Sequence, residues 1–266
     1  MFLKNFFLSG LDCWWNEIPI EDKIPTIAIH GGCATGEIWR GIEPHFTLRN
    51  IPFFAIGLPG HETFKDGLGR LTIGGYTVDV THFLDGSIRS PCNLLGHSMG
   101  GLICQKMGGM KQVQRMALIG TPPAGAPLLN FSLGLSALKY IPAFLFGWPW
   151  KYTWEDFLKL YGNGLDMETA RRIFDASVKE SGWATLQMLS GRPHQVPKIC
   201  GDIGIFAAEE DRVVPPALQR TMVEMYKNPV NKIEMFSFQD GHMSIFGHGQ
   251  EANIQRIVDW LYPANK

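Results

Sequence analysis

Short apolar, β-branched runs alternate with longer helix-like segments along most of this chain, and no other feature restricts its fold as strongly. An N-terminal hairpin and six further strands are expected at residues 2–8, 12–18, 24–30, 51–56, 92–97, 113–120, 199–207 and 232–238. Helices are expected between them, at residues 37–46, 73–84, 98–111, 216–226 and 251–261. Strands that alternate with helices form parallel sheets covered on both faces. The pattern therefore predicts an α/β fold around a mostly parallel central sheet.

The alternation stops between residues 124 and 195. This stretch contains no evident strand, is helical in composition, and is rich in aromatic side chains and prolines. A length of 266 residues allows one or two domains. We expect one α/β domain, formed by residues 1–123 and 196–266, into which residues 124–195 are inserted as a helical cap.

Charge and cysteine content restrict the partners and the compartment. Lys and Arg number 24 against 25 Asp and Glu, so nothing in the net charge of −1 favours binding to nucleic acid. The five cysteines form no CxxC or CxxH pair, which argues against a disulfide framework or a thiolate zinc site and favours a reducing compartment.

The N-terminal end has no signal-peptide pattern, and prolines interrupt the most apolar stretch, residues 122–150, so neither a secretory leader nor a spanning helix is expected. These observations predict a cytoplasmic protein. Contact of residues 141–150 with a membrane surface stays open as an alternative, although no basic face accompanies them, and the oligomeric state is open.

One junction carries a chemical signal. The residues Gly96-His97-Ser98-Met99-Gly100 follow an expected strand and open an expected helix. So sharp a reversal strains the central residue, and glycines two positions away on either side relieve the crowding. Ser98 then stands at a helix N-terminus, where backbone N–H groups favour developing negative charge. Because strand and helix contexts are both present, a nucleophilic serine explains the pattern better than a chance match.

With Gly101 after it, this junction resembles the nucleophile elbow of the α/β-hydrolase superfamily. Nearly the whole chain follows that family's order of elements, and the insertion after residues 113–120 lies where capped members, such as esterases and lipases, carry their lid. The resemblance implies an α/β-hydrolase fold with an inserted helical cap. A serine at the elbow departs from the haloalkane dehalogenases and epoxide hydrolases, whose nucleophile is a carboxylate.

The resemblance also implies the acid and the base of a catalytic triad. Asp211, in the turn after the strand at residues 199–207, matches the family's acid, with Glu209 and Glu210 as rivals that suit a solvated turn better. His242, in a Gly-His pair after the next strand, matches the general base. The order serine, aspartate, histidine is that of this superfamily and differs from the trypsin-like and subtilisin-like orders.

Two backbone N–H groups are implied as the oxyanion hole. One belongs to Met99, directly after the nucleophile, and the other to the loop at residues 30–33, where Gly32 is expected and Cys33 is the alternative. Each such donor stabilises a transition state by about 3 kcal/mol. The remaining histidines show no metal-ligand spacing and are expected to be structural, at positions His30, His45, His61, His82, His97, His194 and His248.

Aromatic side chains concentrate in the expected cap. Ten of the 31 in the chain lie between Phe131 and Tyr161. Over the carboxyl edge of the sheet they would exclude water and form an apolar pocket, whereas some would only bury the cap. We expect a lipophilic acyl or alkyl group as ligand, with Phe146, Trp148 and Val213 in contact with it.

The sequence therefore predicts a serine hydrolase of the esterase or lipase type, acting on small-molecule carboxylic esters with no metal or organic cofactor. Thioester, lactone or C–C bond hydrolysis and perhydrolysis use the same residues and remain alternatives, because a fold alone does not set the reaction. A non-catalytic ligand receptor on this fold is the alternative outside enzymes.

Overall fold

The structure of the protein is a computed structural model, and it describes residues 4–8, 10–21, 23–62, 68–128, 134–191, 197–246 and 250–264. Phe131, His194 and His248, for which the sequence predicts roles, lie outside these residues.

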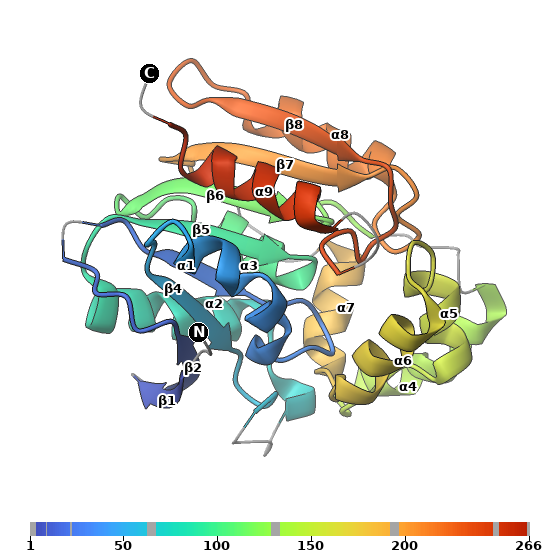
Figure 1. Ribbon diagram of the computed structural model, residues 1–266. Helices are drawn as coiled ribbons and strands as arrows, with labels where there is room; N and C mark the ends of the chain where they lie inside the picture. The colour runs from blue at the N-terminus through green and yellow to red at the C-terminus, as the bar shows by residue number, and fades with distance from the viewer. Residues whose placement is uncertain are drawn as a thin grey trace.

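An eight-stranded sheet in the order β1-β2-β4-β3-β5-β6-β7-β8 forms the centre of the molecule (Figure 1). Its strands are β1 (Lys4–Leu8), β2 (Leu11–Trp15), β3 (Thr26–Ile29), β4 (Phe53–Gly57), β5 (Cys92–His97), β6 (Val113–Ile119), β7 (Asp202–Ala208) and β8 (Ile233–Phe238). The hairpin β1–β2 joins β4 antiparallel, and all other pairings are parallel. The predicted hairpin and mostly parallel sheet are confirmed.

Each face of the sheet is covered by helices, because its central strands are apolar on both sides. Ile27 and Ile29 of β3 join the core beneath α2 (Ile73–Phe83), α3 (Met99–Met107) and α8 (Pro216–Tyr226). Ala28 joins the opposite core, which α1 (Glu43–Thr47) and α9 (Gln250–Leu261) cover (Figure 1). Strands buried on both faces explain why the runs are nearly continuous in apolar residues.

The expectation of one helix over residues 37–46 is wrong. Instead of a single helix over residues 37–46, the chain forms a 3-10 helix, η1 (Gly36–Gly41), followed by the short α1. Pro44 lacks the N–H that a continuous helix would need at this position, and it stands in the first turn of α1, where that N–H has no helical partner.

The stretch between β6 and β7 is helical in the part that the structure describes. It forms η4 (Gly134–Tyr140), α4 (Ile141–Phe146), α5 (Trp154–Tyr161), α6 (Met167–Ala176) and α7 (Gly182–Ser190). Side chains of Thr153, Asp166 and Ser181 cap the amino ends of α5, α6 and α7, as their residue types favour.

Figure 1 shows α4, α5 and α6 grouped beyond the end of the sheet to which β7 and β8 point, with α7 closer to the strands. Ala184 of α7 joins the core beneath α2. We call residues 124–195 the helical segment. Among the described residues, no helix combines the length and apolar character needed to span a bilayer.

Candidate active site

The turn between β5 and α3 holds Ser98 in a strained backbone conformation, with φ 52° and ψ −119°. The glycines around it are required by close contacts. A Cβ on Gly96 would lie 2.6 Å from the Cα of Gly101, and a Cβ on Gly100 would lie 2.1 Å from the carbonyl oxygen of Ile29. The predicted sharp reversal is present, and Ser98 stands at the amino end of α3.

Asp211 lies in the turn after β7 and is buried. Its Oδ1 accepts hydrogen bonds from the N–H groups of Val213 and Val214, both at 2.8 Å. Its Oδ2 accepts from Gln219 Nε2 at 3.1 Å and from His242 Nδ1 at 2.8 Å. Donors on both oxygens fix the carboxylate, and the last of them makes Asp211 rather than Glu209 or Glu210 the partner of the histidine.

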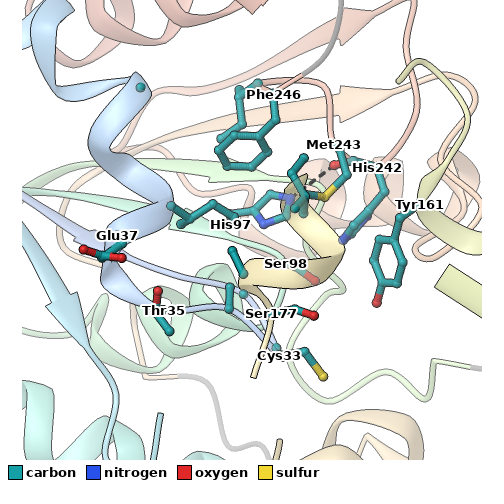
Figure 2. A pocket seen from close by; sticks show the side chains of 18 of the residues that line it. Cys33, Thr35, Glu37, His97, Ser98, Tyr161, Ser177, His242, Met243 and Phe246 are labelled. Carbon is teal, nitrogen blue, oxygen red and sulfur yellow. Dashed lines mark hydrogen bonds between the residues drawn. The ribbon is translucent and has the colours of Figure 1, made fainter. Parts of the chain in front are cut away.

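His242 follows β8 and is oriented by contacts on both sides of its ring. Because Nδ1 donates to Asp211, Nε2 is free to accept a proton, and it is buried with no hydrogen-bond partner among the described residues. The ring of Tyr161 packs edge-on against it at 5.4 Å between centroids. Figure 2 shows the His242 ring between Ser98 and Tyr161.

His97 forms part of the same wall. Its Nε2 donates to the carbonyl oxygen of His242 at 3.1 Å, the contact dashed in Figure 2. Burial, together with the nearby His242 ring, lowers the pKa of His97 to about 3, so the side chain is uncharged at neutral pH. The position agrees with the structural role expected for this histidine.

The loop after β3 passes directly beside the serine. A Cβ on Gly31 would lie 3.0 Å from His97 Nδ1 and 3.1 Å from the Cβ of Ser98. The N–H of Cys33 donates to Glu180 Oε2 at 3.1 Å, whereas no described residue accepts a hydrogen bond from the N–H of Gly32 or Met99. The sequence offers the N–H of either Gly32 or Cys33 as the second oxyanion donor. In the structure the Cys33 N–H is already hydrogen-bonded, whereas that of Gly32 has no acceptor among the described residues.

Cys33 contributes a second nucleophilic group to the pocket wall. Burial, reinforced by the negative charge of Glu180, raises the pKa of its thiol well above the ordinary value. Because the thiolate is the nucleophilic form of cysteine, this thiol does not compete with the serine.

A pocket of about 500 Å³ opens onto Ser98 and His242. The apolar side chains among its walls are Ile38, Ile42, Ile173, Met243, Ile245 and Phe246, together with aromatic rings of the helical segment. The charged side chains of Glu37, Arg40 and Arg172 also line it, and all three are exposed to solvent.

None of the three expected substrate contacts, Phe146, Trp148 and Val213, lines this pocket. Phe146 and Trp148 are 60% and 56% exposed and pack on each other at the surface. Phe146 ends α4, which buries none of its residues, and Trp148 follows that helix. Val213 is buried in a separate small cluster with Leu160 and does not line the pocket. From the helical segment, the aromatic residues that do line the pocket are Tyr152, Phe157 and Tyr161.

Glu180 lies beside the loop after β3, and the sequence predicts no role for it. It is buried just before α7, and its carboxylate accepts the Cys33 N–H from 147 positions away in the chain. Nothing near Glu180 in the sequence marks it as buried. His61 donates to the same carboxylate at 2.8 Å, and the sequence predicts only a structural role for it. Within the described residues, no group of three or more His, Cys, Asp or Glu side chains is arranged to hold a metal ion.

The elbow, the acid–histidine pair and the parallel sheet together define a class of protein, the α/β-hydrolases. A model of the Alpha/beta hydrolase family matches residues 27–253, and the chain belongs to this family. A search of curated proteins by sequence returns no match. The predicted fold class and family are thereby confirmed, and family membership supports a hydrolase without identifying the bond that it cleaves.

Solved structures similar to this chain show the same fold. An esterase from Exiguobacterium antarcticum is 18% identical, covers 98% of each chain and has a TM-score of 0.70. A meta-cleavage product hydrolase from Pseudomonas fluorescens is 16% identical, with 97% of this chain and 96% of that chain covered and a TM-score of 0.71. An enol-lactonase from Burkholderia xenovorans is 17% identical, with 97% and 99% covered and a TM-score of 0.69.

Proposed function

We propose that this chain is a serine hydrolase that cleaves small-molecule carboxylic esters through Ser98, His242 and Asp211. The observation that carries the proposal is the 2.8 Å contact between His242 Nδ1 and Asp211 Oδ2 in a pocket that Ser98 also lines. With Nδ1 committed to the carboxylate, Nε2 is the ring atom available to the serine hydroxyl. Contacts of this kind are often loose before substrate binds and tighten in the complex.

The reaction follows from these positions. The Ser98 proton passes to His242 Nε2 while Oγ bonds to the ester carbonyl carbon, and Asp211 stabilises the imidazolium that forms. The N–H groups of Gly32 and Met99 bind the resulting oxyanion. Collapse of the tetrahedral intermediate breaks the bond to the alcohol oxygen, which receives the proton from His242. A water molecule, deprotonated by His242, then attacks the acyl carbon. Collapse of this second intermediate breaks the bond to Ser98 Oγ, which takes the proton back from His242, and the acid is released.

The pocket supports a lipophilic acyl or alkyl group as the part of the substrate nearest the serine. Its apolar walls would exclude water around the ester, which strengthens the electrostatic contacts made there. In this proposal the helical segment acts as a cap, and Tyr152, Phe157 and Tyr161 contact the substrate where the sequence predicts Phe146, Trp148 and Val213.

The test compares the wild-type chain with Ser98→Ala on p-nitrophenyl esters. We expect wild-type turnover, a loss of at least roughly a thousandfold in kcat for the variant, and a single fluorophosphonate adduct that peptide mass spectrometry places on Ser98. A thermal melt verifies that the variant is folded. Full activity in Ser98→Ala, or a label on another residue, would contradict the mechanism.

The bond that is cleaved needs a separate test, because fold neighbours include an enol-lactonase and a meta-cleavage product hydrolase as well as an esterase. Wild-type kcat/KM is measured on a panel of esters, thioesters, lactones and ring-fission diketones. We expect esters to give the highest values. A higher value for another class would reassign the substrate while leaving Ser98 as nucleophile.

A further inference from the structure

Glu180 has every acceptor position of its carboxylate occupied. Its Oε1 accepts hydrogen bonds from Tyr76 Oη at 3.1 Å and from the N–H of Ser181 at 2.6 Å. Its Oε2 accepts from His61 Nε2 at 2.8 Å and from the N–H of Cys33 at 3.1 Å. A carboxylate accepts about four such bonds only when it is ionised. Although burial opposes the charge, His61 and these donors hold the pKa of Glu180 below its ordinary value.

His61 carries the matching positive charge. Its Nδ1 faces the carbonyl oxygen of Pro59 at 3.2 Å, and its Nε2 faces the Glu180 carboxylate. Both partners are acceptors, so both ring nitrogens bear a proton and the ring is an imidazolium. Burial works against this charge, but Glu180 raises the pKa of His61 above its ordinary value. The pair is therefore buried with no net charge.

The neighbouring His30 is neutral for an equally geometric reason. Its Nδ1 donates to the carbonyl oxygen of Gly31 at 2.8 Å, and its Nε2 accepts the N–H of Leu58 at 3.1 Å. Burial and the adjacent His61 lower its pKa to about 3. In this group of three ionisable side chains, the positive charge thus belongs to His61 alone.

The helical segment is hydrogen-bonded to the loop after β3 through the backbone of Cys33. Besides the bond from the Cys33 N–H to Glu180, the N–H of Val178 donates to the Cys33 carbonyl oxygen at 2.9 Å. Cys33 has a φ of 59°, a left-handed conformation that persists in a non-glycine residue only where its surroundings enforce it. The backbone of Glu180 is itself fixed by two reciprocal hydrogen bonds to Trp150, at 2.7 and 3.0 Å.

We propose that Glu180 is a positioning residue for the oxyanion hole. By engaging the Cys33 N–H it holds the loop so that the Gly32 N–H stays directed at the reacting carbonyl, and His61 neutralises the carboxylate so that its charge does not oppose the oxyanion. The carboxylate lies directly against the loop, since a Cβ on Gly32 would be 3.5 Å from Glu180 Oε2. This inference rests on the proposed function, because it assumes an oxyanion at Gly32.

The test is Glu180→Gln, which keeps the side-chain shape but replaces one acceptor oxygen with an NH2 group facing two donors. We expect kcat for p-nitrophenyl esters to fall about ten- to a hundredfold, with KM changed less than about threefold, since a displaced donor weakens the transition state more than the ground state. Inhibition by phenylboronic acid, whose tetrahedral adduct on Ser98 places an anionic oxygen in the same hole, should weaken by a similar factor.

Asp156→Asn is the matched control. Asp156 is a buried carboxylate of the same helical segment, bonded to Tyr140 and Thr153, with no hydrogen bond to the loop after β3. We expect it to lower the melting temperature while kcat stays within about twofold of wild type. The proposal is overturned if folded Glu180→Gln keeps wild-type kcat, or if Asp156→Asn loses as much kcat as Glu180→Gln.

Hydrogen–deuterium exchange of the wild-type chain tests the hydrogen bond from the Cys33 N–H to Glu180 without a variant and without measuring turnover. The Cys33 amide should exchange with deuterium about a hundredfold or more slowly than an exposed amide, because its N–H is hydrogen-bonded to a buried carboxylate. Rapid exchange at Cys33 overturns the proposal. If exchange is slow but no Ser98-dependent hydrolysis occurs, the proposed function has failed and the positioning role falls with it, whereas the loop contact itself is established.

Discussion

At the scale of single residues, the candidate site is built from backbone conformations that few side chains tolerate. Ser98, Cys33 and Gly120 all have φ between 52° and 59°, and all three lie beside the reacting groups. Glycine adopts this conformation without strain, whereas Ser98 and Cys33 are strained. Such strain persists where the surrounding structure over-determines it, and it clusters at functional sites. The required backbone conformation therefore restricts which residue types fit at these positions as strongly as their chemical roles do.

Gly120→Ala tests that restriction next to the acid–histidine pair. A Cβ at this position would lie 3.3 Å from both Asp211 Oδ2 and His242 Nδ1, in a backbone with φ of 52°. We expect a destabilisation of about 1–2 kcal/mol from the backbone and a kcat at least about tenfold lower, because the pair must shift. Urea unfolding and ester turnover measure the two effects.

Gly10→Ala is the control, since Gly10 has a φ of 85° and open space where a Cβ would stand. It should lose stability to a similar degree and keep kcat. Equal kcat losses in both variants would show that the loss in Gly120→Ala comes from general destabilisation and not from a shift of the Asp211–His242 pair.

The residues that could be predicted from sequence are those whose local context is distinctive. Ser98 lies between glycines at a strand–helix junction. Asp211 and His242 are implied by the resemblance to the α/β-hydrolases, and each follows a strand that can be recognised in the sequence. Glu180 could not be predicted, because its role depends on Cys33 and His61, which are 147 and 119 positions away in the chain. A contact at such separation leaves no periodicity or motif near either partner.

At the scale of elements, the aromatic residues of the helical segment divide into two groups. Tyr152, Phe157 and Tyr161 reach the pocket, whereas Phe146 and Trp148 stay at the surface. Composition predicted that aromatic side chains would gather here. Which of them face the pocket depends on how α4 and α5 dock, and apolar spacing within two short helices does not determine that docking.

Phe157→Ala and Trp148→Ala separate these two groups. Phe157 is 5% exposed, so its truncation should enlarge the pocket, raise kcat/KM for long or branched p-nitrophenyl esters relative to acetate, and destabilise the chain by about 3–5 kcal/mol. Trp148 is exposed, and its truncation should change stability by no more than about 0.5 kcal/mol and leave the chain-length profile unchanged. A profile that shifts more in Trp148→Ala would return the surface aromatics to the binding site.

At the scale of the whole molecule, buried histidines set how stability depends on pH. His30 and His97 stay neutral in the folded chain down to about pH 3, so below the ordinary pKa of 6.5 they take up protons only on unfolding. Acid therefore favours the unfolded state. The raised pKa of His61 acts in the opposite sense, because the stability it contributes is complete below 6.5 and is lost as the pH rises through its folded pKa.

Two carboxyl groups modify this balance. The lowered pKa of Glu180 adds stability that is present above its ordinary value of 4.5 and is lost as the pH falls through its folded pKa. Glu62, whose pKa burial raises to about 7, binds a proton in the folded chain between 4.5 and 7 and so offsets part of the histidine effect there. From the sum of these contributions we expect the stability maximum near pH 6.5.

We expect the free energy of unfolding, measured by urea titration with tryptophan fluorescence, to fall on both sides of that maximum. Between about pH 6.5 and 4.5 the slope should be roughly 1.4–2.7 kcal/mol per pH unit, corresponding to one to two protons taken up on unfolding. His30→Gln, which can keep the bonds to Gly31 and Leu58, should reduce that slope by about 1.4 kcal/mol per unit. His82→Gln, which removes an exposed histidine, is the control. A flat profile from pH 5 to 6.5, or equal slopes in both variants, would show that His30 is protonated in the folded chain.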